Sequence, residues 1–272
     1  MRNVLAAAVL LLLMVGVGAA QWQLVWSDEF DYVGLPDSSK WDYEEGFVRG
    51  NEMQYYTRAQ LENARVQNGV LVIEARKEQI VNPKYRPGTD SWIQQREFGY
   101  YTSASVITRG KASWTYGRIE VRAKVPKGVG TWPAIWTLGA NIAKVKWPQC
   151  GEIDIMEHVG KDPDFAYGTV HFVEDGEHKY LQGKCESKTL AGDFHIYAIE
   201  WFKDRIDFYL DETKYHTFKL DIAGKGEDNP YRRPQYLLMN LALGGSWGGE
   251  IDDSALPQKY VIDYVRVYRA TE

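Results

Sequence analysis

The segment from Tyr116 to Val125 reads YGRIEVRAKV, a run in which apolar and charged side chains alternate. One side of an extended chain would carry its apolar residues, Ile119, Val121, Ala123 and Val125. The other side would carry only Arg, Glu and Lys. This period of two is typical of an antiparallel strand with one buried and one solvent-facing side.

The segments around this strand continue the pattern. Further β-rich runs, separated by turn-forming residues, lie at 71–75, 195–201, 205–210, 215–220 and 261–268. The two runs that flank residues 202–204 predict a β-hairpin. No helix-period segment exceeds about ten residues. The sequence therefore predicts one all-β domain over residues 21–272, a two-sheet antiparallel sandwich or jelly roll. Its first strand, at 24–26, is expected to lie beside its last.

The composition indicates a globular protein and argues against a nucleic-acid partner. Of the 272 residues, 44% are hydrophobic and 25% charged, which is ordinary for a folded domain. Its 32 Lys and Arg against 37 Asp and Glu give a net charge of -5, with no basic run. The chain holds 10 Trp, more than packing usually requires. Indole rings stack on apolar faces and still offer a polar edge, so some of them suit a binding surface.

The first twenty residues have the pattern of a secretory signal peptide. Arg2 precedes an apolar stretch at 4–17, and small residues at 18–20 form a cleavage site before Gln21. The apolar stretch is shorter than the ~20 residues that a membrane-spanning helix needs. We therefore expect a secreted, extracellular protein with no membrane association after cleavage; the alternative is an uncleaved anchor.

The chain has two cysteines, Cys150 and Cys185. In the oxidising environment that secretion implies, they are expected to form one disulfide. The alternative is a pair of free, buried thiols.

Residues 151–158 read GEIDIMEH and concentrate the chemistry of the chain. In a strand, Glu152 and Asp154 share a face, and a β-bulge near Ile155 and Met156 would return Glu157 to that face. Acids in a row raise each other's pKa, so one can stay protonated as a general acid while another is ionised as a nucleophile. Glycoside hydrolysis needs such a pair. An exposed acidic strand face or a calcium site remains the alternative.

The segment from Glu152 to Glu157 resembles the signature of glycoside hydrolase family 16, in the bulged form of its laminarinase-like endo-β-1,3-glucanase branch. The resemblance extends along the chain through the segments Trp26–Phe30, Asn51–Thr57, Gly117–Glu120, Trp132–Trp136, Trp147–Pro148, Gly168–His171 and Asp263–Tyr268. It implies a concanavalin A-like jelly roll with a concave substrate cleft. By the resemblance, Glu152 is the nucleophile and Glu157 the acid/base of a retaining double displacement, with Asp154 tuning both. No metal or organic cofactor takes part in that chemistry.

The candidate substrate-binding residues have two origins. Trp132, Trp136, Trp147 and Trp247 are interpreted as sugar platforms because of their positions near the acids or in Gly-rich loops; packing in the core is the alternative. Asn51, Glu52, Arg76 and His171 are substrate-binding positions by the resemblance, with an ion pair the alternative for Arg76 and a structural role for His171. Asn240 interrupts an apolar strand, so it either satisfies a buried hydrogen bond or faces the cleft. The resemblance also implies a structural calcium near Glu29, Gly69 and Asp263.

The resemblance favours a β-1,3-glucan polysaccharide of the laminarin type as substrate, and an open cleft favours endo action by a monomer. Three alternatives remain. The chain could act on another glycan, such as a galactan, agar or mixed-linkage glucan. It could be a non-catalytic β-glucan-binding receptor. It could also be a calcium-dependent lectin-like module that uses the acids as ligands.

Overall fold

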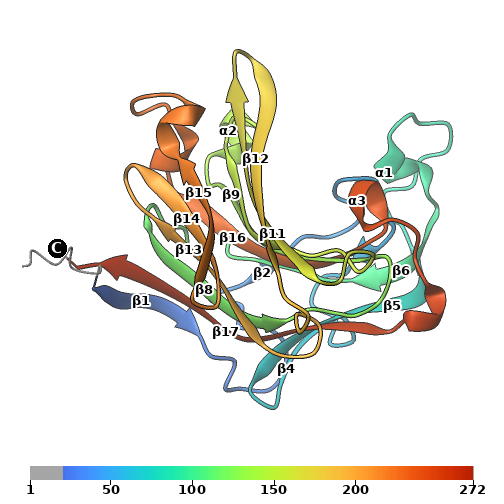
Figure 1. Cartoon of the computed structure of the whole chain (residues 1–272). Helices are drawn as coiled ribbons and strands as arrows, with labels where there is room; N and C mark the ends of the chain where they lie inside the picture. The colour runs from blue at the N-terminus through green and yellow to red at the C-terminus, as the bar shows by residue number, and fades with distance from the viewer. Residues whose placement is uncertain (1–20, 272) are drawn as a thin grey trace, which may run out of the picture.

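The computed structural model describes residues 21–271, and the predicted signal peptide at 1–20 lies outside them. The described chain forms two stacked sheets, as predicted (Figure 1). The ten-stranded sheet runs in the order β15 (Thr213–Lys219), β14 (Arg205–Leu210), β13 (His195–Trp201), β8 (Gly117–Lys124), β17 (Gln258–Ala270), β5 (Val70–Val81), β6 (Phe98–Ser103) and β3 (Tyr55–Tyr56). Beside this path, β1 (Trp22–Asp28) pairs with β17 and β4 (Ala64–Gln67) pairs with β5.

The seven-stranded sheet carries the acidic strand. Its order is β12 (Glu177–Glu186), β11 (Phe165–Glu174), β10 (Glu152–Glu157), β9 (Thr131–Gly139), β16 (Gln235–Leu243), β7 (Ser105–Ile107) and β2 (Asp42–Tyr43). The strand pairs are antiparallel except for β3 with β6. Only short helices connect the strands: α1 (Trp92–Gln95), α2 (Ile142–Val145), α3 (Gly245–Gly248), and the 3₁₀ turns η1 (Leu220–Ala223), η2 (Pro230–Arg232) and η3 (Asp253–Ala255). Within residues 21–271, no helix is long and apolar enough to cross a membrane.

Strand β8 shows why the sequence folds this way. Its side chains alternate strictly between buried and half-buried, with Ile119, Val121 and Ala123 fully inside. These residues join the apolar core between the sheets, where buried apolar area supplies the main driving force for folding. The predicted hairpin is β13 with β14. The predicted pairing of the first and last strands is also confirmed, because β1 lies along β17.

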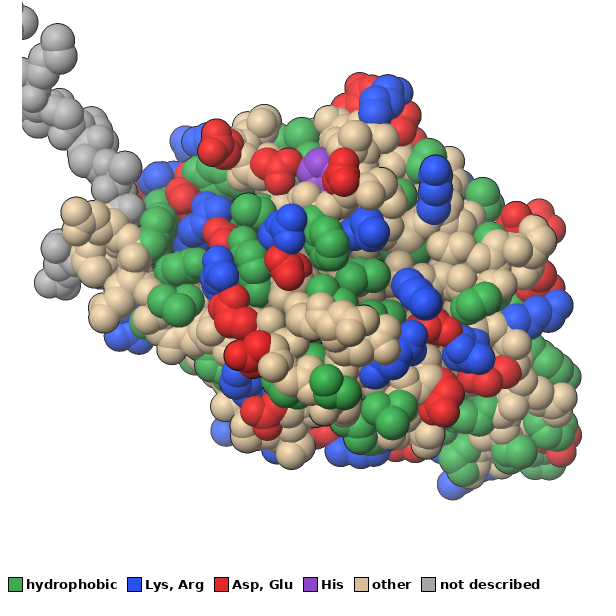
Figure 2. Space-filling view, turned by 90° about the horizontal axis from the view of Figure 1, so that it is seen from below, with side chains coloured by type: hydrophobic (Ala, Val, Ile, Leu, Met, Phe, Trp, Pro, Cys, Tyr) green, Lys and Arg blue, Asp and Glu red, His purple; other side chains and the backbone are tan. Residues whose placement is uncertain are grey.

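The outer face of the ten-stranded sheet carries the charged half of this alternation. Arg118 pairs with Glu120 and Glu200, and Arg122 pairs with Asp263 across neighbouring strands. Figure 2, a view from below, shows basic and acidic side chains interspersed over this face. Opposite charges on adjacent strands support the pairing of the strands.

Candidate active site

The acidic strand β10 contains the bulge that the sequence predicted. Asp154 pairs with Trp136 of β9, but Met156 pairs with the very next residue of β9, Ile135. One extra residue is therefore accommodated on β10, and the facing of the side chains changes after it. As a result, Glu157 opens to the same side as Glu152 and Asp154.

All three carboxyl groups line one cavity of about 900 Å³ on the concave face of the seven-stranded sheet. The cavity lies between the β11–β12 hairpin and the loop that carries α3 (Figure 1). The predicted residues that also line it are Glu52, Trp132, Trp136, Trp147, His171, Asn240 and Trp247. Their strands and loops are distant in sequence, so the sheet brings the candidate site together.

Two predicted substrate-binding residues lie outside this lining. Asn51 is exposed, with its neighbours Gly50 and Glu52 forming the cleft wall instead. Arg76 lies on β5, which belongs to the ten-stranded sheet, and its guanidinium pairs with Glu74 and lies 3.8 Å from Glu78. The structure thus places Arg76 in the ion pair that was its alternative interpretation.

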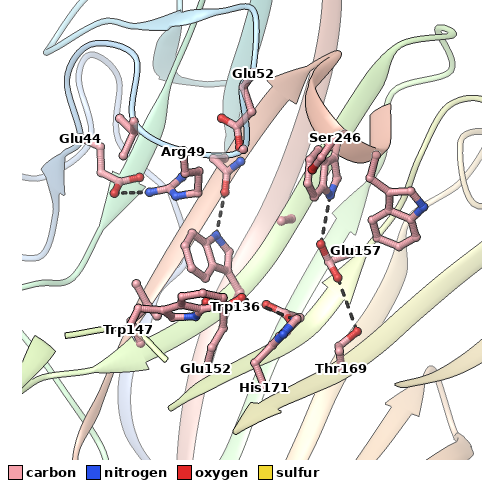
Figure 3. Close-up of a pocket in the computed structure, with 18 of the residues that line it drawn as sticks. Glu44, Arg49, Glu52, Trp136, Trp147, Glu152, Glu157, Thr169, His171 and Ser246 are labelled. Atoms are coloured by element: carbon pink, nitrogen blue, oxygen red, sulfur yellow. Dashed lines mark hydrogen bonds and ion pairs between the residues drawn. The ribbon is translucent and has the colours of Figure 1, made fainter. Parts of the chain in front are cut away.

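Glu157 is held by donors from both neighbouring strands (Figure 3). The indole Nε1 of Trp132 donates to its Oε1 at 3.1 Å, and the hydroxyl of Thr169 lies 3.5 Å from its Oε2. Gln182 in turn donates to the Thr169 hydroxyl at 3.0 Å. Burial, followed by the charges of the other two acids, raises the pKa of Glu157 well above its ordinary value. A carboxyl in this environment keeps its proton and can act as a general acid.

Glu152 and Asp154 face an imidazole instead. Nε2 of His171 lies 3.1 Å from Oδ2 of Asp154 and 3.7 Å from Oε1 of Glu152. Burial, and then the neighbouring Asp154, raise the pKa of Glu152 to about 8, while His171 acts in the opposite direction. Burial also raises the pKa of Asp154. The ligand atoms of these three residues lie within 4.8 Å of one another. Carboxyl groups whose pKa values burial raises in this way, within one cleft, are typical of a catalytic site.

The sequence left open whether Asn240 is buried or faces the cleft, and the structure shows that it does both. It lines the cavity, and its Oδ1 accepts from the indole of Trp136 at 2.7 Å. Its amide donates to the hydroxyl of Tyr56 at 2.9 Å, and that hydroxyl donates to Glu52 at 3.2 Å. This chain of hydrogen bonds fixes the orientation of Trp136 at the cleft floor.

Sequence reasoning did not single out Arg49, Gln54 or Tyr56. Arg49 stacks over the Trp136 ring with its guanidinium 4.7 Å from the ring centre, and it pairs with Glu44. Gln54 donates to Glu52 at 2.6 Å. Gln54 and Tyr56 lie in the segment 51–57 on which the family resemblance partly rests, which was the available signal. Arg49 lies just outside that segment.

The four tryptophans form the walls and floor of the cleft. Trp132 packs edge-on against Trp247 at a centroid distance of 5.7 Å, and Trp247 packs against Tyr167 at 4.9 Å. Trp136 is only 6% exposed, whereas Trp147 is 45% exposed at the rim. All four indoles line the cavity, where an indole can stack on the apolar face of a sugar.

The expected disulfide is wrong, since both cysteines are free thiols. Cys150 precedes β10, and Cys185 lies on β12 opposite Ala166. The first residue of β10, Glu152, is level with His171, five residues farther along β11 than Ala166. At ~3.3 Å per residue that offset alone is about 16 Å, far beyond the ~7 Å that a disulfide permits between Cα atoms. Cys150 also packs on the cleft side of the sheet and Cys185 on the core side.

The three residues expected at a calcium site lie near one another along β17. Glu29 follows β1, whose Asp28 pairs with Val265, and Gly69 precedes β5, whose Leu71 pairs with Ile262. Asp263 lies between those two partners. The carboxylates of Glu29 and Asp263 are engaged by Arg266 at 2.8 Å and Arg122 at 2.5 Å. Both carboxylates are therefore already neutralised by arginines.

Comparison with known proteins identifies the class. Residues 51–266 match the model of glycosyl hydrolases family 16, and the chain belongs to that family. It is therefore a glycoside hydrolase by family.

One curated relative and two solved structures illustrate which members of the family this chain is similar to. The chain is 48% identical over 266 residues to a beta-glucanase of Rhodothermus marinus, covering 93% of this chain and 87% of that protein. The X-ray structure of the laminarinase from Rhodothermus marinus has 46% identity and a TM-score of 0.79, covering 93% of this chain and 99% of that one. A structure reported for endo-acting O-glycanases of the human gut microbiota, which initiate mucin breakdown, has 39% identity and a TM-score of 0.86. That likeness covers 92% of each chain.

Proposed function

We propose that this chain is a secreted, monomeric endo-β-1,3-glucanase that cleaves laminarin-type glucan with retention of anomeric configuration. The observation that carries the proposal is that two acids on one face of β10 lie in different environments. Glu157 is held by two donors, whereas Glu152 faces His171 and the open cavity. Two carboxyl groups in different environments are the requirement for glycoside hydrolysis.

The proposed reaction has two balanced steps. Ionised Glu152 attacks the anomeric carbon while Glu157 gives its proton to the glycosidic oxygen, so the leaving chain departs as a neutral alcohol. Water then attacks the same carbon and passes a proton to Glu157, and the bond to Glu152 breaks. The ionised carboxylate of Glu152, together with Asp154, stabilises the positive charge that develops on the sugar ring.

The shape of the cleft favours action within a polymer. Its volume of about 900 Å³ is at the upper end of the range for small-molecule sites, so it can hold several sugar rings. The beta-glucanase and laminarinase relatives support a glucan as the substrate. The likeness to endo-acting O-glycanases supports a second candidate, cleavage within another glycan such as the O-glycans of mucin.

One panel of substrates tests the proposal. Reducing-sugar release is measured with laminarin, mixed-linkage glucan, agarose and mucin O-glycans, using wild type and Glu152→Gln. We expect wild type to release oligosaccharides fastest from laminarin and the variant to be folded but inactive. Release from mucin O-glycans or agarose alone would favour the second candidate. Binding of laminarin without cleavage by either protein would make the chain a receptor.

A further inference from the structure

A second histidine lies directly behind His171 on the β11–β12 hairpin. Nε2 of His178 is 2.9 Å from Nδ1 of His171, and the two ring planes are nearly parallel, 12° apart, with centroids 5.1 Å apart. Trp147 packs against both imidazoles, with its ring centroid 4.7 Å from that of His178 and 6.3 Å from that of His171. His178 itself is exposed and is not part of the cavity lining.

The turn of the hairpin fixes this arrangement. Glu174 pairs with Glu177, so only Asp175 and Gly176 connect the strands, and both have positive φ, 53° and 81°. Two central residues of this kind match the twist of the flanking strands and set the register of the hairpin. That register places His178 diagonally across from His171.

The contacts of His171 determine where its proton lies. One ring nitrogen, Nε2, faces the carboxylates of Asp154 and Glu152. The contact is one of charge, because Oδ2 of Asp154 accepts no hydrogen bond in this geometry. A hydrogen on Nε2 would turn its positive end toward the carboxylates, whereas a lone pair there would face their negative charge. A neutral imidazole with hydrogen on Nε2 has a bare Nδ1, which needs a donor. Nε2 of His178 lies at hydrogen-bond distance and supplies that donor.

We propose that His178 is a positioning residue for the hydrolysis, which acts by donating to Nδ1 of His171 and so keeps the proton of His171 on Nε2. The N–H of the imidazole is then held toward Asp154 and Glu152, and its positive end favours the ionised nucleophile. This inference rests on the proposed function, but the tautomer of His171 can be measured without substrate.

The surroundings support a neutral His178. Burial, and then the neighbouring His171, lower its pKa. The groups that face the two imidazoles are Glu152 and Asp154 of β10, Tyr180 of β12, and Trp147. The hydroxyl of Tyr231 is bonded to the His171 backbone carbonyl. The charged neighbours of His178 along β12, Glu177 and Lys179, pair with each other at 2.6 Å.

The kinetic test compares three substitutions at His178 with a control. His178→Phe keeps an aromatic ring against Trp147 and His171 but removes the donor, whereas His178→Gln keeps an amide donor. Lys179→Gln, on the adjacent exposed position, is the matched control. For His178→Phe we expect kcat on laminarin to fall about tenfold with KM within twofold, as for loss of one orienting hydrogen bond. The acid limb of its pH profile should move to higher pH, because the ionised nucleophile is less favoured. His178→Gln should recover most of kcat, and His178→Ala should resemble His178→Phe.

The spectroscopic test does not depend on activity. The chain has only 5 His, so long-range ¹H–¹⁵N spectra of the imidazoles can be assigned from the His178 and His171 variants. We expect His171 of the wild type to carry its hydrogen on Nε2, and His178→Phe to lose that preference. A wild-type His171 protonated on Nδ1 overturns the proposal, as does a His178→Phe variant with unchanged kcat and pH limb. An inactive wild type would refute the proposed function, and the spectra would still decide the role of His178.

Discussion

The buried acids predict that replacing the candidate nucleophile will stabilise the protein, and increasingly so as the pH rises. The pKa of Glu152 is raised from 4.5 to about 8, chiefly by burial and then by Asp154. A carboxyl with a raised pKa in the folded state favours folding of the protonated form. Below about pH 4 Glu152 is protonated in both the folded and the unfolded state and does not lower the free energy of unfolding. As the pH rises through the folded pKa, the protein progressively loses the stability that protonated Glu152 gave it.

The size of the effect follows from the same shift. One pKa unit corresponds to about 1.36 kcal/mol. A rise of the Glu152 pKa from 4.5 to about 8 therefore lowers the free energy of unfolding by about 5 kcal/mol at alkaline pH. We take half of this as a lower figure, because water reaches the 16%-exposed side chain. For a domain of this size, each kcal/mol moves Tm by roughly 2–4 °C. We therefore compare the Tm difference between Glu152→Gln and wild type at two pH values. This difference should be about 5–20 °C larger at pH 8 than at pH 4.

Thermal unfolding followed by calorimetry at half-unit pH intervals measures this difference. Glu174→Gln is the matched control, since Glu174 is an exposed glutamate near the end of the neighbouring strand β11. We expect its Tm to stay within about 2 °C of wild type throughout the range. A Glu152→Gln advantage that is constant with pH, or larger in acid, would refute the reasoning.

Other predictions concern single contacts. Trp132→Phe removes the donor to Glu157, so the pKa of Glu157 should rise further and the alkaline limb of the kcat/KM profile should move to higher pH; an unchanged limb would exclude the contact. We also propose that calcium binds between Glu29, Gly69 and Asp263. Adding Ca²⁺ should then raise Tm by several degrees and EDTA reverse this, with activity at 25 °C retained; identical melting in both would exclude the site. Because both thiols are free, dithiothreitol should leave Tm unchanged, and a fall in Tm would indicate a disulfide.

The sequence predicted those structural features that depend on neighbouring residues in the chain. The alternation in β8 and the bulge in β10 both follow from the period of a strand and the facing of its side chains. The two-sheet architecture follows from many such strands with no long helix between them. These features depend on residues that are close together in the chain.

Contacts between distant segments could not be predicted from the residues alone. The hydrogen bond between Asn240 and Tyr56 joins positions 184 residues apart. The pairing of Cys150 with Cys185 failed because strand register, which the composition does not reveal, separates them along the sheet. Arg76 likewise lies on the ten-stranded sheet, away from the cleft. The role of His178 depends on a two-residue turn that sets its register against His171.

The central claim is that Glu152 and Glu157 have different roles, and rescue by azide tests it most directly. Glu152→Ala and Glu157→Ala are incubated with an aryl β-laminaribioside, with and without azide, and the product anomer is identified by NMR. Without the nucleophile, azide should attack the sugar directly and give the α-glycosyl azide. Without the acid/base, azide should attack the glycosyl-enzyme and give the β-glycosyl azide. The same anomer from both variants, or the two anomers exchanged, would contradict the account.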